Sequence, residues 1–433
     1  MTKPAGTIVF FPEGAFGPTN NCVGIGNVLR ERGFRVVFVI EESFAGTLEA
    51  QGFEEALMRL KPPPEVPEVP GQFWKDFVAE TAPVFREPTY QQLAGFIKPV
   101  WEELIDGARY VDERLSVIFD DIAPDVIVED NVVAFPAVLA SGRPWARIVS
   151  CNPLELRDPT LPPTFSGFPT FERSGWIQFR GRYRELHRDL HADFSAFCEE
   201  SCGEPLPEGD FMYESDFLNM YVYPAELDYD RFQALGPTWH QLETSVRATD
   251  SAFELPEGWG LNGEKVVYLS LGSLGSADVD LMNRLIELLA RTPHKIIVSK
   301  GPQHELIDLA DNMIGAEFLP QTSLLPHVDA VITHGGNNTV TECMYFGRPM
   351  IVLPLFWDQH DNAQRVHERR FGVRLPSYAF SDLEFFTALD GLLNDSEMHD
   401  RMAKTSARLQ ELPGTVKAAD LIQRLAAEKT PIT

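Results

Sequence analysis

One short stretch of the chain combines residues that could bind a phosphate group. Residues 334–339 read His-Gly-Gly-Asn-Asn-Thr. They follow a run at 330–333 that predicts a buried strand and precede a run at 340–346 that predicts a helix closed by Gly347. Two glycines let a ligand approach the backbone, and the first turn of a helix presents unpaired N–H groups and a positive dipole end. We therefore expect a phosphate site here; a tight turn that only needs small residues is the alternative.

Polar groups further along the chain extend this site. Glu342 lies four residues after Asn338, so both side chains project from one helix face, where a carboxylate suits a ribose diol. Asp358 and Gln359 follow a predicted buried strand at 350–353, at its carboxyl end, where open α/β sheets bind ligands.

A flat ring and an amide precede the phosphate stretch, at Phe318 and Gln321, and could contact a base. In chain order the sequence thus supplies groups for a base, a diphosphate, a ribose and a sugar. That is the set needed for a nucleotide sugar.

Residues 318–360 resemble the donor-binding box of the inverting, family 1 nucleotide-sugar glycosyltransferases, which have the GT-B fold. The resemblance implies that Phe318 and Gln321 bind the base, that His334, Gly336, Asn338 and Thr339 bind the diphosphate, that Glu342 binds the ribose and that Asp358 and Gln359 bind the sugar. Ser273, after the predicted strand 266–269, resembles the family's diphosphate-contacting loop. The resemblance is dense over residues 265–375 and thinner elsewhere, and it implies neither a metal nor a further cofactor.

The position of the general base differs from the family pattern. The resemblance implies a His after the first strand, in a Gly-His-x-Asn-Pro context, but the ungapped match over residues 11–21 places Pro18 there. The Asp that orients this His matches Asp130. Three accounts stay open: Asp130 or Glu13 acts as the base with a pKa raised by burial, the acceptor needs little base, or the protein binds without turnover.

Strand–helix alternation predicts an α/β fold with two doubly wound, Rossmann-like domains of the GT-B type that face a cleft. We expect an acceptor-binding domain at 1–235, a polar linker at 236–262, a nucleotide-sugar-binding domain at 263–412 and, as in related folds, a last helix at 413–433 that crosses back. The expected strands of the first domain are 7–11, 35–40, 124–129 and 145–150, with helices at 21–31 and 135–141. Those of the second are 266–269, 295–299, 315–318, 330–333 and 350–353.

Aromatic residues are concentrated between the first strands, in a segment that lines the acceptor pocket in the family. The candidates for acceptor binding are Phe16, Trp74, Phe77 and Phe85, and for each single ring core packing is the favoured alternative. A second irregular stretch, at 153–176, is rich in Pro, Gly and Phe and could form a lid.

Composition predicts a cytoplasmic enzyme. The formal charge of −27 argues against nucleic acid and anionic membranes, no apolar run reaches the length of a membrane span, and the five cysteines are scattered and odd in number. The expected function is transfer of a hexose from a UDP- or TDP-sugar to a small apolar polyketide, phenolic or terpenoid, by a monomer or homodimer. A catalytically silent protein that binds a nucleotide sugar or a hydrophobic ligand is the alternative, and an epimerase is a third possibility.

Overall fold

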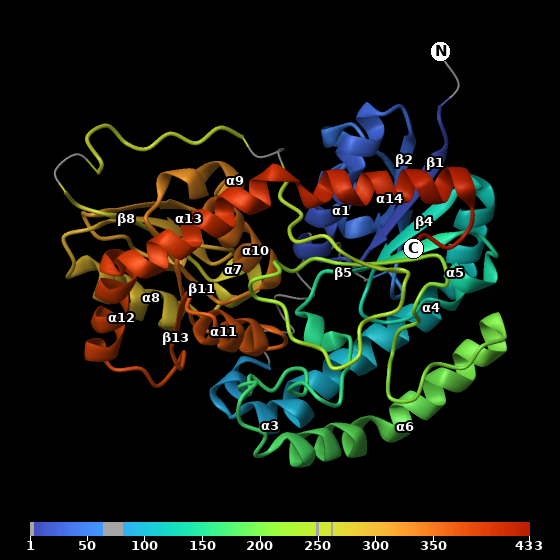
Figure 1. Cartoon of the computed structure of the whole chain (residues 1–433), viewed down its shortest axis with the longest axis horizontal. Coiled ribbons are helices and arrows are strands. Elements are labelled where there is room, and N and C mark those ends of the chain that lie inside the picture. Colours follow the sequence, from blue (N-terminus) through green and yellow to red (C-terminus); the bar gives the residue numbers. More distant parts are fainter. Residues whose placement is uncertain (1–3, 64–80, 248–250, 261–262) are drawn as a thin grey trace.

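The computed structural model describes residues 4–63, 81–247, 251–260 and 263–433. Two parallel sheets organise these residues into two domains (Figure 1). Both sheets have the doubly wound strand order, so the predicted fold class is confirmed. Trp74 and Phe77 lie outside the described residues.

The first sheet has seven parallel strands in the order β3-β2-β1-β4-β5-β6-β7. Their bounds are β1 Thr7–Pro12, β2 Arg35–Glu41, β3 Glu54–Met58, β4 Val126–Asp130, β5 Trp145–Val149, β6 Leu218–Tyr221 and β7 Trp239–Gln241. The sequence analysis did not include β3, β6 and β7. These strands are short or lie at the sheet edge, so their hydrophobic patterns are weak. β7 falls within the segment expected as a linker.

The helices of the first domain are α1 Phe16–Glu31, α3 Thr89–Gln92, α4 Lys98–Ile122, α5 Pro136–Ala140 and α6 Trp176–Cys202. Helix α1 begins five residues before the expected start at residue 21. Pro18 falls in its first turn, where the missing N–H breaks no helical hydrogen bond. Helix α6 lies along the lower edge of the domain in Figure 1, below α4.

The second sheet has six parallel strands in the order β10-β9-β8-β11-β12-β13. The strands are β8 Val266–Ser270, β9 Lys295–Ser299, β10 Met313–Ala316, β11 Ala330–Thr333, β12 Met350–Val352 and β13 Gly372–Arg374. The helices are α7 Gly272–Gly275, α8 Val279–Ala290, α9 Gln321–Leu324, α10 Asn337–Phe346, α11 Gln359–Glu368, α12 Asp382–Asn394, α13 Ser396–Glu411 and α14 Gly414–Glu428.

Helix α14 leaves the second domain and lies across the first (Figure 1). Its apolar side, with Ala418, Ile422 and Leu425, is buried in the same hydrophobic cluster as Ile8 and Phe10 of β1. Close packing is possible at Gly414, where an added Cβ would lie 1.8 Å from the carbonyl oxygen of Thr244.

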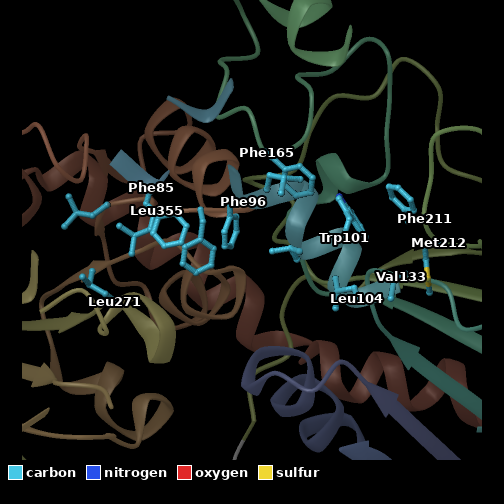
Figure 2. Close-up of a cluster of buried hydrophobic side chains, with 14 of the residues drawn as sticks. Phe85, Phe96, Trp101, Leu104, Val133, Phe165, Phe211, Met212, Leu271 and Leu355 are labelled. Atoms are coloured by element: carbon cyan, nitrogen blue, oxygen red, sulfur yellow. The ribbon is translucent and has the colours of Figure 1, made fainter. Parts of the chain in front are cut away.

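An aromatic cluster joins the two domains (Figure 2). Phe85 and Phe96 of the first domain contact Phe356 of the second, with ring centroids 4.8 and 5.1 Å apart. Trp357 contacts Phe165 at 4.5 Å. These rings form part of one continuous core, so the domains share buried apolar surface. No helix in the described part of the chain has the length and apolar character needed to cross a bilayer.

Candidate functional site

Helix α10 begins where the two domains meet, and the imidazole of His334 lies just before it. Gly335 has φ +91°, a backbone conformation that favours glycine. Added Cβ atoms at Gly272 and Gly336 would lie 2.7 and 2.6 Å from the His334 ring. The glycines therefore leave room for the ring and keep the backbone accessible. The N–H groups of the first turn of α10, from residue 337, have no intrahelical acceptor.

Burial lowers the pKa of His334 to about 4, and a contact with the Ser270 backbone opposes this shift. The imidazole is therefore neutral near pH 7. It can donate one hydrogen bond to a diphosphate without carrying a charge. The attraction for an anion comes from the N–H groups and the helix dipole.

The polar residues after His334 hold the domains together. Asn338 Nδ2 donates to the carbonyl oxygen of Gly17 at 2.9 Å, and Asn21 Nδ2 donates to Asn338 Oδ1 at 3.1 Å. Asn337 Nδ2 donates to the carbonyl oxygens of Ser150 (2.8 Å) and Val222 (2.9 Å). Thus Asn338, expected at the diphosphate, also contacts α1 of the first domain.

The residues expected at the ribose and base form one hydrogen-bonded network. Gln321 Nε2 donates to Thr339 Oγ1 at 3.2 Å and to Glu342 Oε2 at 2.6 Å. The Glu342 carboxylate also forms an ion pair with Arg247, at 3.1 Å. Arg247 lies in the segment between the domains and no local motif marks it, so sequence reasoning missed it. The Glu342 carboxylate is therefore held in place by two partners, Gln321 and Arg247.

Phe16, at the start of α1, contacts a residue of the second domain that was expected at the base. Its ring contacts that of Phe318, with centroids 6.5 Å apart, and both rings are about half exposed. Phe85, in contrast, is 5% exposed and packs into the aromatic cluster. The structure therefore separates two residues that were expected together at the acceptor. Ser273 lies in α7, next to Gly272 and beside His334.

Asp358 and Gln359, expected at the sugar, lie at the end of β12 and the start of α11. Asp358 Oδ2 accepts the N–H of Asn152, from the first domain, at 2.8 Å. Gln359 Oε1 accepts the N–H groups of Leu355 (3.0 Å) and Phe356 (3.2 Å). Trp357, between them and the cluster, has φ +55°, which is uncommon for a bulky residue and occurs mostly at functional sites.

Carboxylates gather at the carboxyl ends of neighbouring strands of the first sheet. Pro12 and Asp130 are register partners in β1 and β4, where the strand order reverses. The N–H of Glu13 donates to the carbonyl oxygen of Asp130 at 2.9 Å. This is the switch point at which doubly wound sheets bind ligands.

Burial, reinforced by neighbouring acids, raises the pKa of several of these groups. It raises the pKa of Glu13 to about 7, with further contributions from Glu41, Glu155 and Asp358. It raises the pKa of Asp130 to about 8, although a hydrogen bond from Ser150 opposes the shift. The segment after β5 connects this group to the other domain, because Ser150 donates to Asp130 and Asn152, two residues later, donates its N–H to Asp358.

One oxygen of Asp130 is free to accept a proton. Asp130 is 3% exposed, and its Oδ1 accepts the Ser150 hydroxyl at 2.8 Å. Its Oδ2 is buried and has no hydrogen-bond partner in the described part of the chain. A buried unpartnered oxygen in a cleft calls for a ligand or a function. Asp130 therefore combines a raised pKa with an available acceptor atom.

The raised pKa of Asp130 predicts a pH-dependent stability. Its folded pKa, about 8, exceeds the usual value of about 4, so its stabilising contribution is present at low pH and is lost as the pH rises toward 8. The free energy of unfolding of Asp130→Asn relative to wild type should therefore increase between pH 5 and pH 8. The upper limit is about 1.4 kcal/mol per pH unit. Urea unfolding at each pH checks this, with exposed Asp120→Asn as the control; a difference independent of pH would contradict it.

The comparisons with known proteins agree with this geometry. The family model described as "UDP-glucoronosyl and UDP-glucosyl transferase" matches residues 246–413. The C-terminal part of the chain is therefore similar to this glycosyltransferase family. Among solved structures, the glycotransferase of kitacinnamycin superposes with a TM-score of 0.69 at 21% identity, covering 98% of this chain and 99% of that one. Glycosyltransferase VinC in complex with DTDP gives a TM-score of 0.63 at 17% identity over 98% and 100% of the two chains. Both likenesses show the GT-B fold.

The curated relatives match over different lengths. Human 2-hydroxyacylsphingosine 1-beta-galactosyltransferase is 33% identical over 38% of this chain and 32% of its own length. Demethyllactenocin mycarosyltransferase of Streptomyces fradiae is 23% identical over 96% of this chain and 86% of its own. The chain spans only half of the uncharacterized UDP-glucosyltransferase YojK of Bacillus subtilis, at 25% identity. The match of higher identity thus covers the smaller share of the chain.

Proposed function

We propose that this protein is an inverting glycosyltransferase that moves a hexose from a UDP- or TDP-sugar to a small apolar acceptor. The observation that carries the proposal is a pair of hydrogen bonds from the segment after β5. The Ser150 hydroxyl donates to Asp130 at 2.8 Å, and the N–H of Asn152, two residues later, donates to Asp358 at 2.8 Å. A candidate base of one domain and the candidate sugar site of the other are thus held by the same short segment. The similarity of the C-terminal part to this family supports the choice of donor.

The proposed reaction uses both domains. The N–H groups of α10 and the neutral His334 bind the diphosphate and stabilise it as it leaves. The acceptor hydroxyl attacks the anomeric carbon from the opposite face, and its oxygen forms the new C–O bond as the bond to the diphosphate breaks. The hydroxyl proton passes to the carboxylate of Asp130, or to Glu13 beside it. Because the acceptor attacks from the face opposite the diphosphate, the configuration at the anomeric carbon is inverted.

Two of the curated and solved relatives point to the acceptor class. Demethyllactenocin mycarosyltransferase and the glycotransferase of kitacinnamycin are named for natural products. We extend this class to the present chain, together with the aromatic side chains of its first domain. A catalytically silent nucleotide-sugar-binding protein remains the alternative, since Pro18 occupies the expected histidine position and Asp358 is bonded to Asn152.

Product analysis distinguishes a glycosyltransferase from a catalytically silent binding protein. Incubation with α-configured UDP- and TDP-hexoses and a panel of phenols and alcohols should give β-glycosides and one nucleoside diphosphate per glycoside. Proton NMR of the product reports the anomeric configuration, and an α-glycoside would contradict inversion. Nucleotide binding without any product across the panel would favour the silent protein.

A further inference from the structure

A cavity of about 530 Å³ lies under helix α6, in the first domain. One face of α6 lines it, with side chains three or four residues apart, and the irregular segments around Leu154–Thr164 and Glu208–Phe211 line the other side. Its volume falls within the range of small-molecule sites. It lies apart from the glycine turn and α10, which bind the donor in the proposed function.

The α6 side of the cavity is strongly basic. Arg180, Arg184 and Arg188 succeed one another at four-residue spacing along the wall. Like charges at this spacing destabilise an isolated helix. Arg184 and Arg188 are exposed, and neither has an ion pair or hydrogen bond within the residues that the structure describes. A row of three arginines therefore does not stabilise α6, and in a chain with formal charge −27 we expect it to have a role other than folding.

Two polar atoms in the cavity wall are left without partners. His187 is 3% exposed, and its Nδ1 lies 2.7 Å from the carbonyl oxygen of Tyr183. A carbonyl only accepts, so Nδ1 carries the proton and Nε2 is an acceptor. That Nε2 and the hydroxyl oxygen of Thr164 are both buried without a hydrogen-bond partner in the described ranges. Burial lowers the pKa of His187 to about 4, which keeps its ring neutral.

The remaining wall is mostly apolar and aromatic, with Leu154, Phe179, Tyr183 and Phe211. It also includes two carboxylates, those of Asp158 and Glu208. Tyr183 stacks on His187 with ring centroids 4.1 Å apart, and the Arg157 guanidinium lies over the Tyr183 ring at 4.9 Å. Arg157 is already paired with Asp210, at 2.8 Å, so its charge is compensated. Arg180 donates to the carbonyl oxygens of Asp158 and Pro159. The guanidinium groups of the wall that have no partner in the described chain are therefore those of Arg184 and Arg188.

We propose that this cavity is a binding site for an amphipathic anion. The ligand would have a ring-sized apolar body against Phe179, Tyr183 and Phe211 and an anionic group, such as a carboxylate, sulfonate or phosphate, at Arg184 and Arg188. A polar substituent on the body would meet His187 Nε2 and the Thr164 hydroxyl.

The site is close to the donor cleft without being part of it. The ring of Phe165 contacts Tyr183 on the cavity wall, at 6.3 Å, and Trp357 beside Asp358, at 4.5 Å. The proposal concerns binding alone and does not depend on sugar transfer.

Two fluorescent probes with the same body test the proposal. 8-Anilinonaphthalene-1-sulfonate carries a sulfonate, and N-phenyl-1-naphthylamine lacks it. The double variant Arg184→Gln/Arg188→Gln should raise the Kd of the sulfonate about tenfold and leave that of the neutral probe within about twofold. Both side chains are exposed and unpartnered in the described chain, so the variant should fold.

The control is Arg173→Gln/Arg182→Gln, which removes two charges from positions that do not line the cavity. It should leave both Kd values unchanged. Raising NaCl from 0.05 to 0.5 M should weaken binding of the sulfonate probe more in the wild type than in the Arg184/Arg188 variant. Salt screens the attraction between the sulfonate and the two arginines, which the variant lacks. An unchanged Kd for the sulfonate in that variant, or an equal rise in the control, would overturn the proposal.

Discussion

Asp130→Asn should lower kcat/KM for an alcohol acceptor by ~10²-fold or more, the usual contribution of a positioned base. Asparagine keeps the shape and still accepts the Ser150 hydroxyl, but it cannot take a proton. An acceptor already ionised at the assay pH should lose much less, since it has no proton to give. Steady-state kinetics with one alcohol and one acidic phenol measures both. Equal losses for the two would indicate a structural role for Asp130.

Two further variants locate the base. Glu13→Gln should have the smaller effect, because the unpartnered buried oxygen belongs to Asp130; the reverse ranking would move the base to Glu13. Pro18→His should raise activity toward alcohols. Residue 18 lies in the first turn of α1, where a backbone N–H needs no acceptor within the helix. The helix should therefore tolerate a histidine in place of the proline.

His334→Ala should weaken nucleoside-diphosphate binding by about 1–3 kcal/mol, the size of a hydrogen bond to a charged group. The imidazole is neutral, with a pKa of about 4, so the loss should be the same at pH 6 and pH 8. Gly336→Ala should have a similar effect while retaining the ring, since its Cβ would lie 2.6 Å from His334 Nε2. Titration calorimetry with UDP and TDP measures each affinity.

Exposed His327 serves as the matched control, because His327→Ala removes a histidine of the same domain that lies outside the glycine turn at 334–336. Unchanged affinity in both the His334 and Gly336 variants would show that the glycine turn has only a structural role. A loss that grows below pH 6 would mean instead that His334 acts as a cation.

The fold and the glycine turn could be predicted because their signals are local. Residues 330–346 hold a strand, a glycine turn and a helix in one continuous stretch, and the buried strands of both sheets are mostly apolar runs. The binding role of the turn stays a prediction. The edge strand β7 has three half-buried residues, too few for a pattern.

The contacts between the domains could not be predicted in the same way. Asn152 reaches Asp358 across 206 residues, and Arg247 reaches Glu342 across 95. No local spacing in the sequence predicts a contact between residues so far apart along the chain. The same holds for pKa values, which depend on burial. Burial was expected to raise the pKa of a carboxylate base, but its extent depends on the folded surroundings, which raise the pKa of Glu13 to about 7 and that of Asp130 to about 8.

The pH dependence of kcat/KM for an alcohol acceptor and for a permanently ionised acceptor, compared in the wild type, tests the carboxylate base most directly. A base must be deprotonated, so the raised pKa values predict that the rate with the alcohol falls as the pH drops below about 7–8. The rate with the ionised acceptor should show no such fall. The same acid limb for both acceptors would contradict the account, as would full activity with the alcohol down to pH 5.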